Sequence, residues 1–140
     1  MKTLIRNSRM TLLALLLAGA SGMTLGAGVA VTLTGDQESP PVQTTATGKG
    51  TITVGADKSV SGSVTTSGIS GTMAHIHEGA VGVNGSPIIP LVKAGDNQWS
   101  VPAGAKLSDQ QYVEYKAGGL YVNVHSAAHP GGEIRAQIKP

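Results

Sequence analysis

Hydrophobic and polar residues alternate along several short segments of the chain, which is the pattern of half-buried β-strands. Valine, threonine, isoleucine and serine dominate these segments, and glycine-containing turns separate them. We predict strands at residues 30–34, 50–54, 59–65, 72–77, 88–91, 98–101, 120–125 and 133–139. So many short strands in one chain of this length indicate an all-β fold, either an antiparallel Greek-key β-sandwich or a flattened barrel.

One segment departs from the strand pattern. Ser108 is followed three residues later by Gln111, which is a capping-box signature for the start of a helix. Gly118 is a plausible end for it. We therefore predict one short helical stretch between the last two groups of strands.

The alternation also decides which side chains share a face. On residues 72–77, His75 and His77 lie on the same side, because side chains point to alternate faces of a strand. On residues 120–125 the apolar positions face the core, which leaves His125 on the opposite face. If these strands are neighbours, the three histidines converge on one polar face.

A converging set of imidazoles is the donor set of a metal site, because the two Cα atoms of a His-x-His pair lie only about 6.5–7 Å apart. His75, His77 and His125 are the candidate ligands. His129 follows in a turn before a proline and could be a fourth ligand, a group that supports the ligands, or an exposed side chain. The alternative interpretation is that the histidines are polar residues of a solvated sheet face.

Arg135 shares the polar face of the last strand and has two interpretations. It could form an ordinary surface ion pair with Glu133, or it could place a positive charge beside the metal to attract an anionic substrate. Nucleophilic catalysis is not indicated, because the chain has no cysteine and no Gly-x-Ser-x-Gly turn.

Residues 1–27 have the features of a secretory signal peptide. A basic head with Lys2, Arg6 and Arg9 precedes a short apolar run, and small residues follow it. We expect cleavage after Ala20 or Ala27, which leaves one domain, residues 28–140, in the periplasm or secreted. The apolar run is too short to span a bilayer, so we expect no membrane span in the mature protein.

The charge of the chain depends on this leader. The whole chain has ten Lys and Arg residues against eight Asp and Glu. Without the three basic residues of the leader the net charge is −1, so nucleic acid is not an expected partner.

Three segments of the chain resemble the CHRD domain, a module named from chordin. They are residues 33–42, with Gly35-Asp36-Gln37-Glu38; residues 74–85, with the His-x-His-Glu-Gly run; and residues 121–138, with Tyr-Val-Asn-Val-His and Gly-Gly-Glu-Ile-Arg. They span nearly the whole sequence that follows the leader.

The same histidine segments are similar to the copper half of Cu/Zn superoxide dismutases, which implies a superoxide-dismutase-like fold. This resemblance implies that His75, His77 and His125 hold copper and that Arg135 guides superoxide. No His- and Asp-rich loop follows Gly85, so no zinc site is expected.

The resemblances together imply an exported copper-only superoxide dismutase, with superoxide as its small-molecule substrate. The alternative is a non-catalytic module, which either holds copper or serves as an extracellular interaction domain.

Overall fold

The alternating segments form nine strands of one antiparallel sheet. The structure is a computed structural model that describes residues 26–140, so the expected leader lies outside the described residues except for its last two positions. The elements are β1 (Gly28–Thr34), η1 (Gly35–Gln37), β2 (Thr47–Val54), β3 (Val60–Ser67), β4 (Gly71–Glu78), β5 (Pro87–Pro90), β6 (Val92–Gly95), β7 (Gln98–Ser100), α1 (Asp109–Lys116), β8 (Leu120–Ser126) and β9 (Ile134–Ile138).

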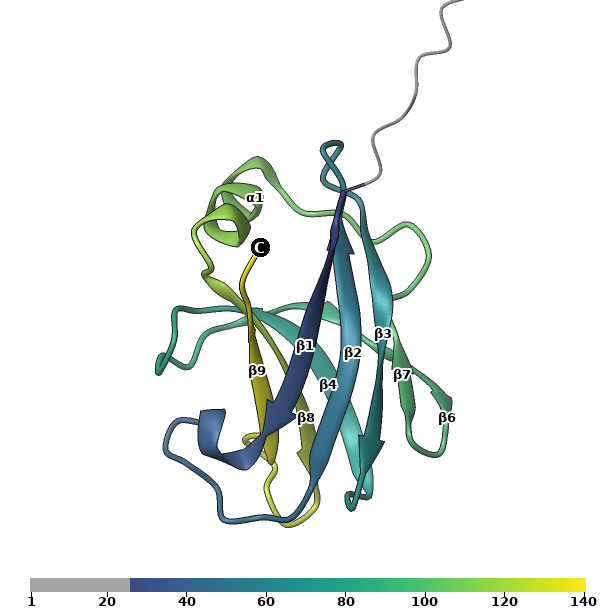
Figure 1. Ribbon diagram of the computed structural model, residues 1–140, viewed down its shortest axis with the longest axis vertical. Helices are drawn as coiled ribbons and strands as arrows, with labels where there is room; N and C mark the ends of the chain where they lie inside the picture. Colours follow the sequence, from purple (N-terminus) through teal and green to yellow (C-terminus); the bar gives the residue numbers. More distant parts are fainter. Residues whose placement is uncertain (1–25) are drawn as a thin grey trace, which may run out of the picture.

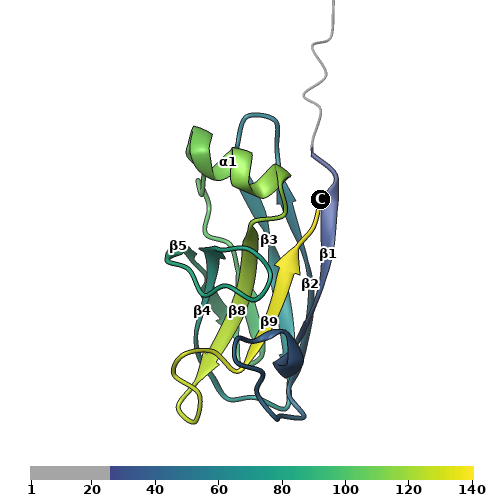
Figure 2. The ribbon, with the colours of Figure 1, turned by 90° about the vertical axis from the view of Figure 1, so that its left-hand side faces the viewer.

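The strand order in the sheet is β5-β4-β8-β9-β1-β2-β3-β7-β6. β1, β2 and β3 follow one another as hairpins, whereas β4 pairs with β8, which is far away in the sequence. β9 completes the layer by pairing with both β8 and β1. Figure 2 shows β4, β8 and β9 side by side, with β1, β2 and β3 beyond them.

One segment brings the two edges of the sheet together. β5 pairs with β4, β6 pairs with β7, and only Leu91 separates β5 from β6. The backbone N–H of Leu91 donates to the carbonyl of Ala74 in β4 at 2.9 Å. The sheet is therefore a nearly closed, flattened barrel, which confirms the predicted all-β antiparallel class (Figure 1).

The inside of the barrel is filled by the apolar positions of the alternating strands. Leu33, Ile52, Val64, Val122 and Ile134 are all fully buried there. Burying one such side chain contributes about 1.5–3 kcal/mol, so this core supplies most of the favourable free energy of folding.

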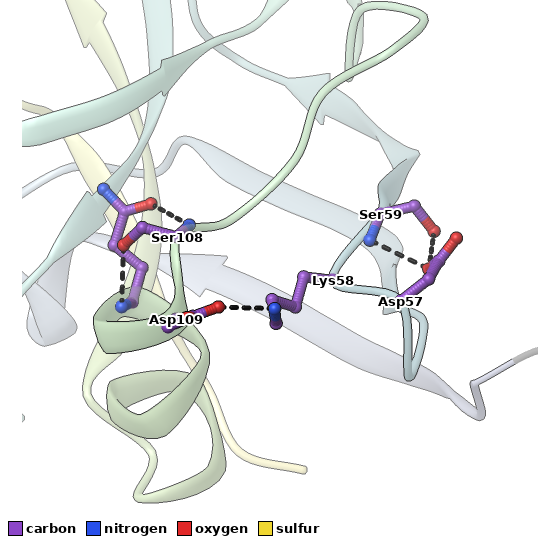
Figure 3. A network of polar contacts seen from close by, with 6 residues as sticks. Asp57, Lys58, Ser59, Ser108 and Asp109 are labelled. Atoms are coloured by element: carbon purple, nitrogen blue, oxygen red, sulfur yellow. Dashed lines mark hydrogen bonds and ion pairs between the residues drawn. The ribbon is translucent and has the colours of Figure 1, made fainter.

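The predicted helix is α1, and it covers one end of the barrel (Figure 1). The hydroxyl of Ser108 accepts from the N–H of Gln111 at 3.1 Å, and the side chain of Gln111 accepts from the N–H of Ser108 at 2.9 Å. This is the reciprocal capping box expected from the sequence. Figure 3 shows it beside an ion pair between Asp109 and Lys58, which ties the helix to the β2–β3 turn. Among the described residues, no helix is long and apolar enough to cross a membrane.

The polar face of β4, β8 and β9 is covered rather than solvated. All seven residues of β8 are buried, including its polar ones. The loop between β4 and β5 crosses in front of β8 (Figure 2), and Arg135 and Gln137 of β9 donate to its backbone carbonyls. The alternative interpretation of a solvated sheet face is therefore wrong for His77 and His125, which are buried. Strand alternation does not show which loops fold back over a face.

Candidate metal centre

Three histidines meet on this covered face, one pair from β4 and the third from β8. In the antiparallel register His75 lies opposite Asn123, and His125 lies opposite Met73. Directly opposite residues point to the same side of a sheet, and so do residues two apart on one strand. His75, His77 and His125 therefore share one face, as the sequence predicted.

The three rings are close enough to act on one ion. Nδ1 of His75 lies 3.1 Å from Nε2 of His125. The ring centroids are 5.4 Å apart for His75 and His77, and 5.9 Å apart for His77 and His125. One ring nitrogen from each residue falls within 4.8 Å of the other two. A single ion that contacts three nitrogens needs this kind of cluster.

Backbone carbonyls fix the tautomers of two of the imidazoles. Nδ1–H of His77 donates to the carbonyl of Gly85 at 3.0 Å, and Nδ1–H of His125 donates to the carbonyl of Pro130 at 2.9 Å. In both rings Nε2 is then the unprotonated nitrogen, which can bind a metal. That of His125 accepts a hydrogen bond from Nδ1–H of His75 at 3.1 Å, which a bound ion would replace. Nε2 of His77 is buried and has no hydrogen-bond partner among the described residues, so it is an unsatisfied acceptor aimed at this site.

The surroundings favour the neutral form of His75 and His77. Burial lowers the pKa of His75, and the neighbouring His125 and His77 lower it further. Burial is also the largest cause of the lowered pKa of His77, although its hydrogen bond to Gly85 acts in the opposite direction. A neutral imidazole is the form that binds a metal, so the donor set fits a cation that prefers nitrogen ligands.

The glycine-rich loop after β4 holds His77 in place through Gly85. A Cβ on Gly85 would lie 1.5 Å from the carbonyl oxygen of Glu78, so only glycine fits. The N–H of Gly85 donates to the Tyr121 hydroxyl at 3.0 Å. This bond orients the Gly85 carbonyl, which accepts the hydrogen bond from His77. This glycine therefore supports a candidate ligand.

Arg135 lies in β9, and its exposed fraction is only 1%. Its guanidinium donates to the carbonyls of Ala80 at 2.9 Å and Val83 at 3.0 Å, and to the side chain of Gln137 at 3.0 Å. Of the two interpretations of Arg135, the surface ion pair with Glu133 is wrong. Residues two apart on a strand share a face, but the loop after β4 supplies closer acceptors and removes Arg135 from solvent.

Glu133 is instead bound by hydroxyl groups. Its carboxylate accepts from Ser126 at 2.7 Å and from Thr44 at 2.9 Å. These bonds tie the turn before β9 to β8 and to the β1–β2 connection.

Tyr121 links Arg135 to the histidines. The carbon centre of the Arg135 guanidinium lies 3.5 Å from the centre of the Tyr121 ring. The same ring stacks on His77, with centroids 4.8 Å apart and an interplanar angle of 10°. A positive charge therefore lies one aromatic ring away from a candidate ligand, and its presence further lowers the pKa of His77.

Glu38 is a site residue that sequence analysis did not assign. It belongs to the acidic run before the double proline, and its exposed fraction is 6%. The side-chain amide of Asn123 reaches its carboxyl at 3.5 Å, and a Cβ on Gly132 would lie 2.6 Å from the same oxygen. Burial raises the pKa of Glu38 to about 6, against the opposing effects of Asn123 and Arg135. The only signal for Glu38 in the sequence was its place in the Gly35-Asp36-Gln37-Glu38 motif.

Two cavities flank Glu38, with volumes of about 410 and 640 Å³. Arg135 and Lys139 line the smaller one, and His129 lines the larger one. His129 lies on the turn after β8, where its backbone N–H and carbonyl bond to Ser126. Among the described residues, the group of neighbouring metal-ligating side chains consists of the other three histidines.

The CHRD domain family model matches residues 29–138 of the chain. This range contains every strand from β1 to β9 except the first residue of β1, and it includes all the histidines described above. No curated protein and no solved structure matches the chain.

Proposed function

We propose that this chain, which belongs to the CHRD domain family, holds one copper ion on His75, His77 and His125 and uses it to remove superoxide. The observation that carries the proposal is the cluster of three imidazoles, with the Nε2 of His77 buried and unpaired. An unsatisfied buried acceptor costs free energy unless an occupant compensates for it.

The donor set favours copper among the common metals. Three imidazoles and no carboxylate do not suit Mg²⁺ or Ca²⁺, which prefer oxygen ligands. Copper binds nitrogen donors more tightly than the other divalent ions of the first transition row. We propose a copper site without an accompanying zinc site, in keeping with the absence of a His- and Asp-rich loop after Gly85.

When bound, copper supplies one-electron chemistry, so that two superoxide ions and two protons give dioxygen and hydrogen peroxide. Arg135 contributes a fixed positive charge that favours the approach of an anion, and it also lines the smaller cavity. The carbonyls of Gly85 and Pro130 hold the imidazoles in the orientation that directs Nε2 to the ion. Protons come from solvent.

A superoxide assay on the copper-loaded protein tests this proposal. The wild-type protein should remove superoxide faster than the same concentration of free copper, and His125→Ala should lose that advantage. His129→Ala is the matched comparison, since it removes a histidine outside the three-residue group and should retain activity. A wild-type rate no higher than that of free copper would contradict the enzymatic proposal.

One observation favours a non-catalytic alternative in which the protein only holds copper. The guanidinium of Arg135 is buried and its donors are already engaged by backbone carbonyls and Gln137. An arginine in this state stabilises the loop over the site and contributes less to the capture of a substrate. Stoichiometric copper binding without superoxide removal would establish this alternative.

We also propose that the protein is exported and acts in the periplasm or outside the cell. The support is the basic, apolar and small-residue order of residues 1–27. β1 begins at Gly28, so cleavage after Ala27 would release the chain at the first residue of the barrel. Mass spectrometry of the protein recovered from the producing cells should give an N-terminus at residue 21 or 28. An intact residue 1 would contradict export by this leader.

A further inference from the structure

Met73 stands beside the three histidines on the same face of the sheet. It lies two residues before His75 on β4, and it pairs directly with His125 of β8. Side chains that lie directly opposite each other on antiparallel strands have Cβ atoms about 4.5–5.5 Å apart. The sulfur of a methionine extends well beyond its Cβ on a flexible chain, so the side chain is long enough to reach the His125 imidazole.

The backbone at the start of β4 sets this pairing. A bulge between Gly71 and Met73 leaves Thr72 without a partner and moves the register, so that Met73 rather than Thr72 lies opposite His125. The hydroxyl of Thr72 then donates to the carbonyl of His125 at 3.3 Å.

Exposure increases along this face toward Met73. The exposed fraction of His77 is 7%, His75 is half-buried, and that of Met73 is 49%. The site is therefore closed at the His77 end by the loop after β4 and open to solvent at the Met73 end. Met73 is thus an exposed apolar side chain at the open end of the site.

Met73 is also the single sulfur donor that the barrel offers. The chain has no cysteine, and its other three methionines, at positions 1, 10 and 23, precede the described residues. Imidazole binds both oxidation states of copper, whereas a thioether is a soft ligand that selects Cu(I). A copper site that alternates between two states gains from one ligand that favours the reduced state.

We propose that Met73 is a fourth ligand of the site, and that its thioether binds copper in the Cu(I) state while the three imidazoles hold the ion in both states. This inference rests on the proposed copper site. It adds that the open end of the site selects reduced copper. It also gives the protein a route for taking up Cu(I), since the sulfur is the first ligand that an arriving ion meets.

X-ray absorption at the copper edge tests the ligand directly in the full chain. The Cu(I)-loaded wild-type protein should show one sulfur neighbour in addition to nitrogen neighbours, and selenomethionine substitution should replace it with selenium. Met73→Leu should lose the sulfur signal. Met73→Leu keeps the methionines at positions 1, 10 and 23, so a sulfur signal that this variant loses belongs to Met73.

Affinity measurements with a Cu(I) chelator provide the second readout. Met73→Leu should weaken Cu(I) binding about tenfold or more, equivalent to about 1.4 kcal/mol or more. Cu(II) affinity should change much less. Leucine has a similar volume and Met73 is half exposed, so the variant should keep the melting temperature of the wild type. Val92→Ala, at an exposed apolar position of β6, is the matched control and should leave both affinities unchanged.

The outcomes separate the two proposals. Copper bound by nitrogen neighbours alone, with an unchanged Cu(I) affinity in Met73→Leu, overturns the role of Met73 and leaves the histidine site intact. Failure of the wild-type protein to retain copper in either state overturns both.

Discussion

Glu38→Gln should remove a pH dependence of stability that the buried carboxyl imposes on the wild-type protein. The pKa of Glu38 rises from its ordinary value of 4.5 to about 6 in the folded state, with burial as the largest cause. The folded protein therefore keeps a proton that the unfolded chain releases. By linkage, the free energy of unfolding falls as the pH rises from about 4.5 to about 6.

The size of the effect follows from the shift. One pKa unit is worth about 1.4 kcal/mol, so the rise in the pKa of Glu38 corresponds to roughly 2 kcal/mol. Glu38 also lines two cavities, and water in them screens the charge, so we expect about 1–2 kcal/mol. The lowered pKa values of His75 and His77 act in the opposite direction, because the unfolded imidazoles lose their protons near pH 6.5 and stability rises there. Both proteins share that contribution, so their difference isolates Glu38.

Urea unfolding of the metal-free protein at pH 4, 5, 6 and 7 measures this difference. Relative to the wild type, Glu38→Gln should gain about 1–2 kcal/mol of stability between the lowest and the highest pH. Asp96→Asn removes an exposed carboxylate from the β6–β7 turn and is the matched control. Parallel curves for wild type and Glu38→Gln across the whole range would refute the assignment of a buried, proton-holding carboxyl.

Two further predictions concern the loop that covers the site. Arg135→Leu leaves the carbonyls of Ala80 and Val83 without their donor. It should lower the free energy of unfolding, measured in urea, by about 1–3 kcal/mol or more. An unchanged urea midpoint would contradict the role of Arg135 in holding the loop. Gly85→Ala forces a Cβ against the carbonyl of Glu78 and displaces the group that orients His77, so it should weaken copper binding in a chelator competition. Gly131→Ala is the control and should leave copper binding unchanged, because a Cβ there meets nothing within 4 Å. Equal losses of copper affinity in the two variants would contradict the role of Gly85 in orienting His77.

Alternation along the strands was sufficient to predict β4, β8 and the shared face of the three histidines. Each of these strands buries one apolar side in the barrel, so the period of two fixes where the remaining side chains point. β6 was missed for the converse reason. All four of its residues are exposed, and a strand that buries neither face carries no alternation in its sequence.

The environment of the site could not be predicted in the same way. Arg135 and Glu38 appeared as polar residues of a face or a loop, yet both are buried by segments that lie far away in the sequence. The burial of Arg135 depends on the loop after β4, and that of Glu38 on the turn before β9. Such contacts follow from the closure of the barrel, which a local pattern does not reveal.

Electron paramagnetic resonance of the Cu(II)-loaded protein, together with the copper content per chain, is the most direct test of the three-histidine site. The wild type should bind one copper ion per chain and show nitrogen hyperfine structure from its imidazole ligands. His125→Ala should lose part of that structure and bind copper more weakly. Copper that binds substoichiometrically, or a spectrum that His125→Ala leaves unchanged, would contradict the account.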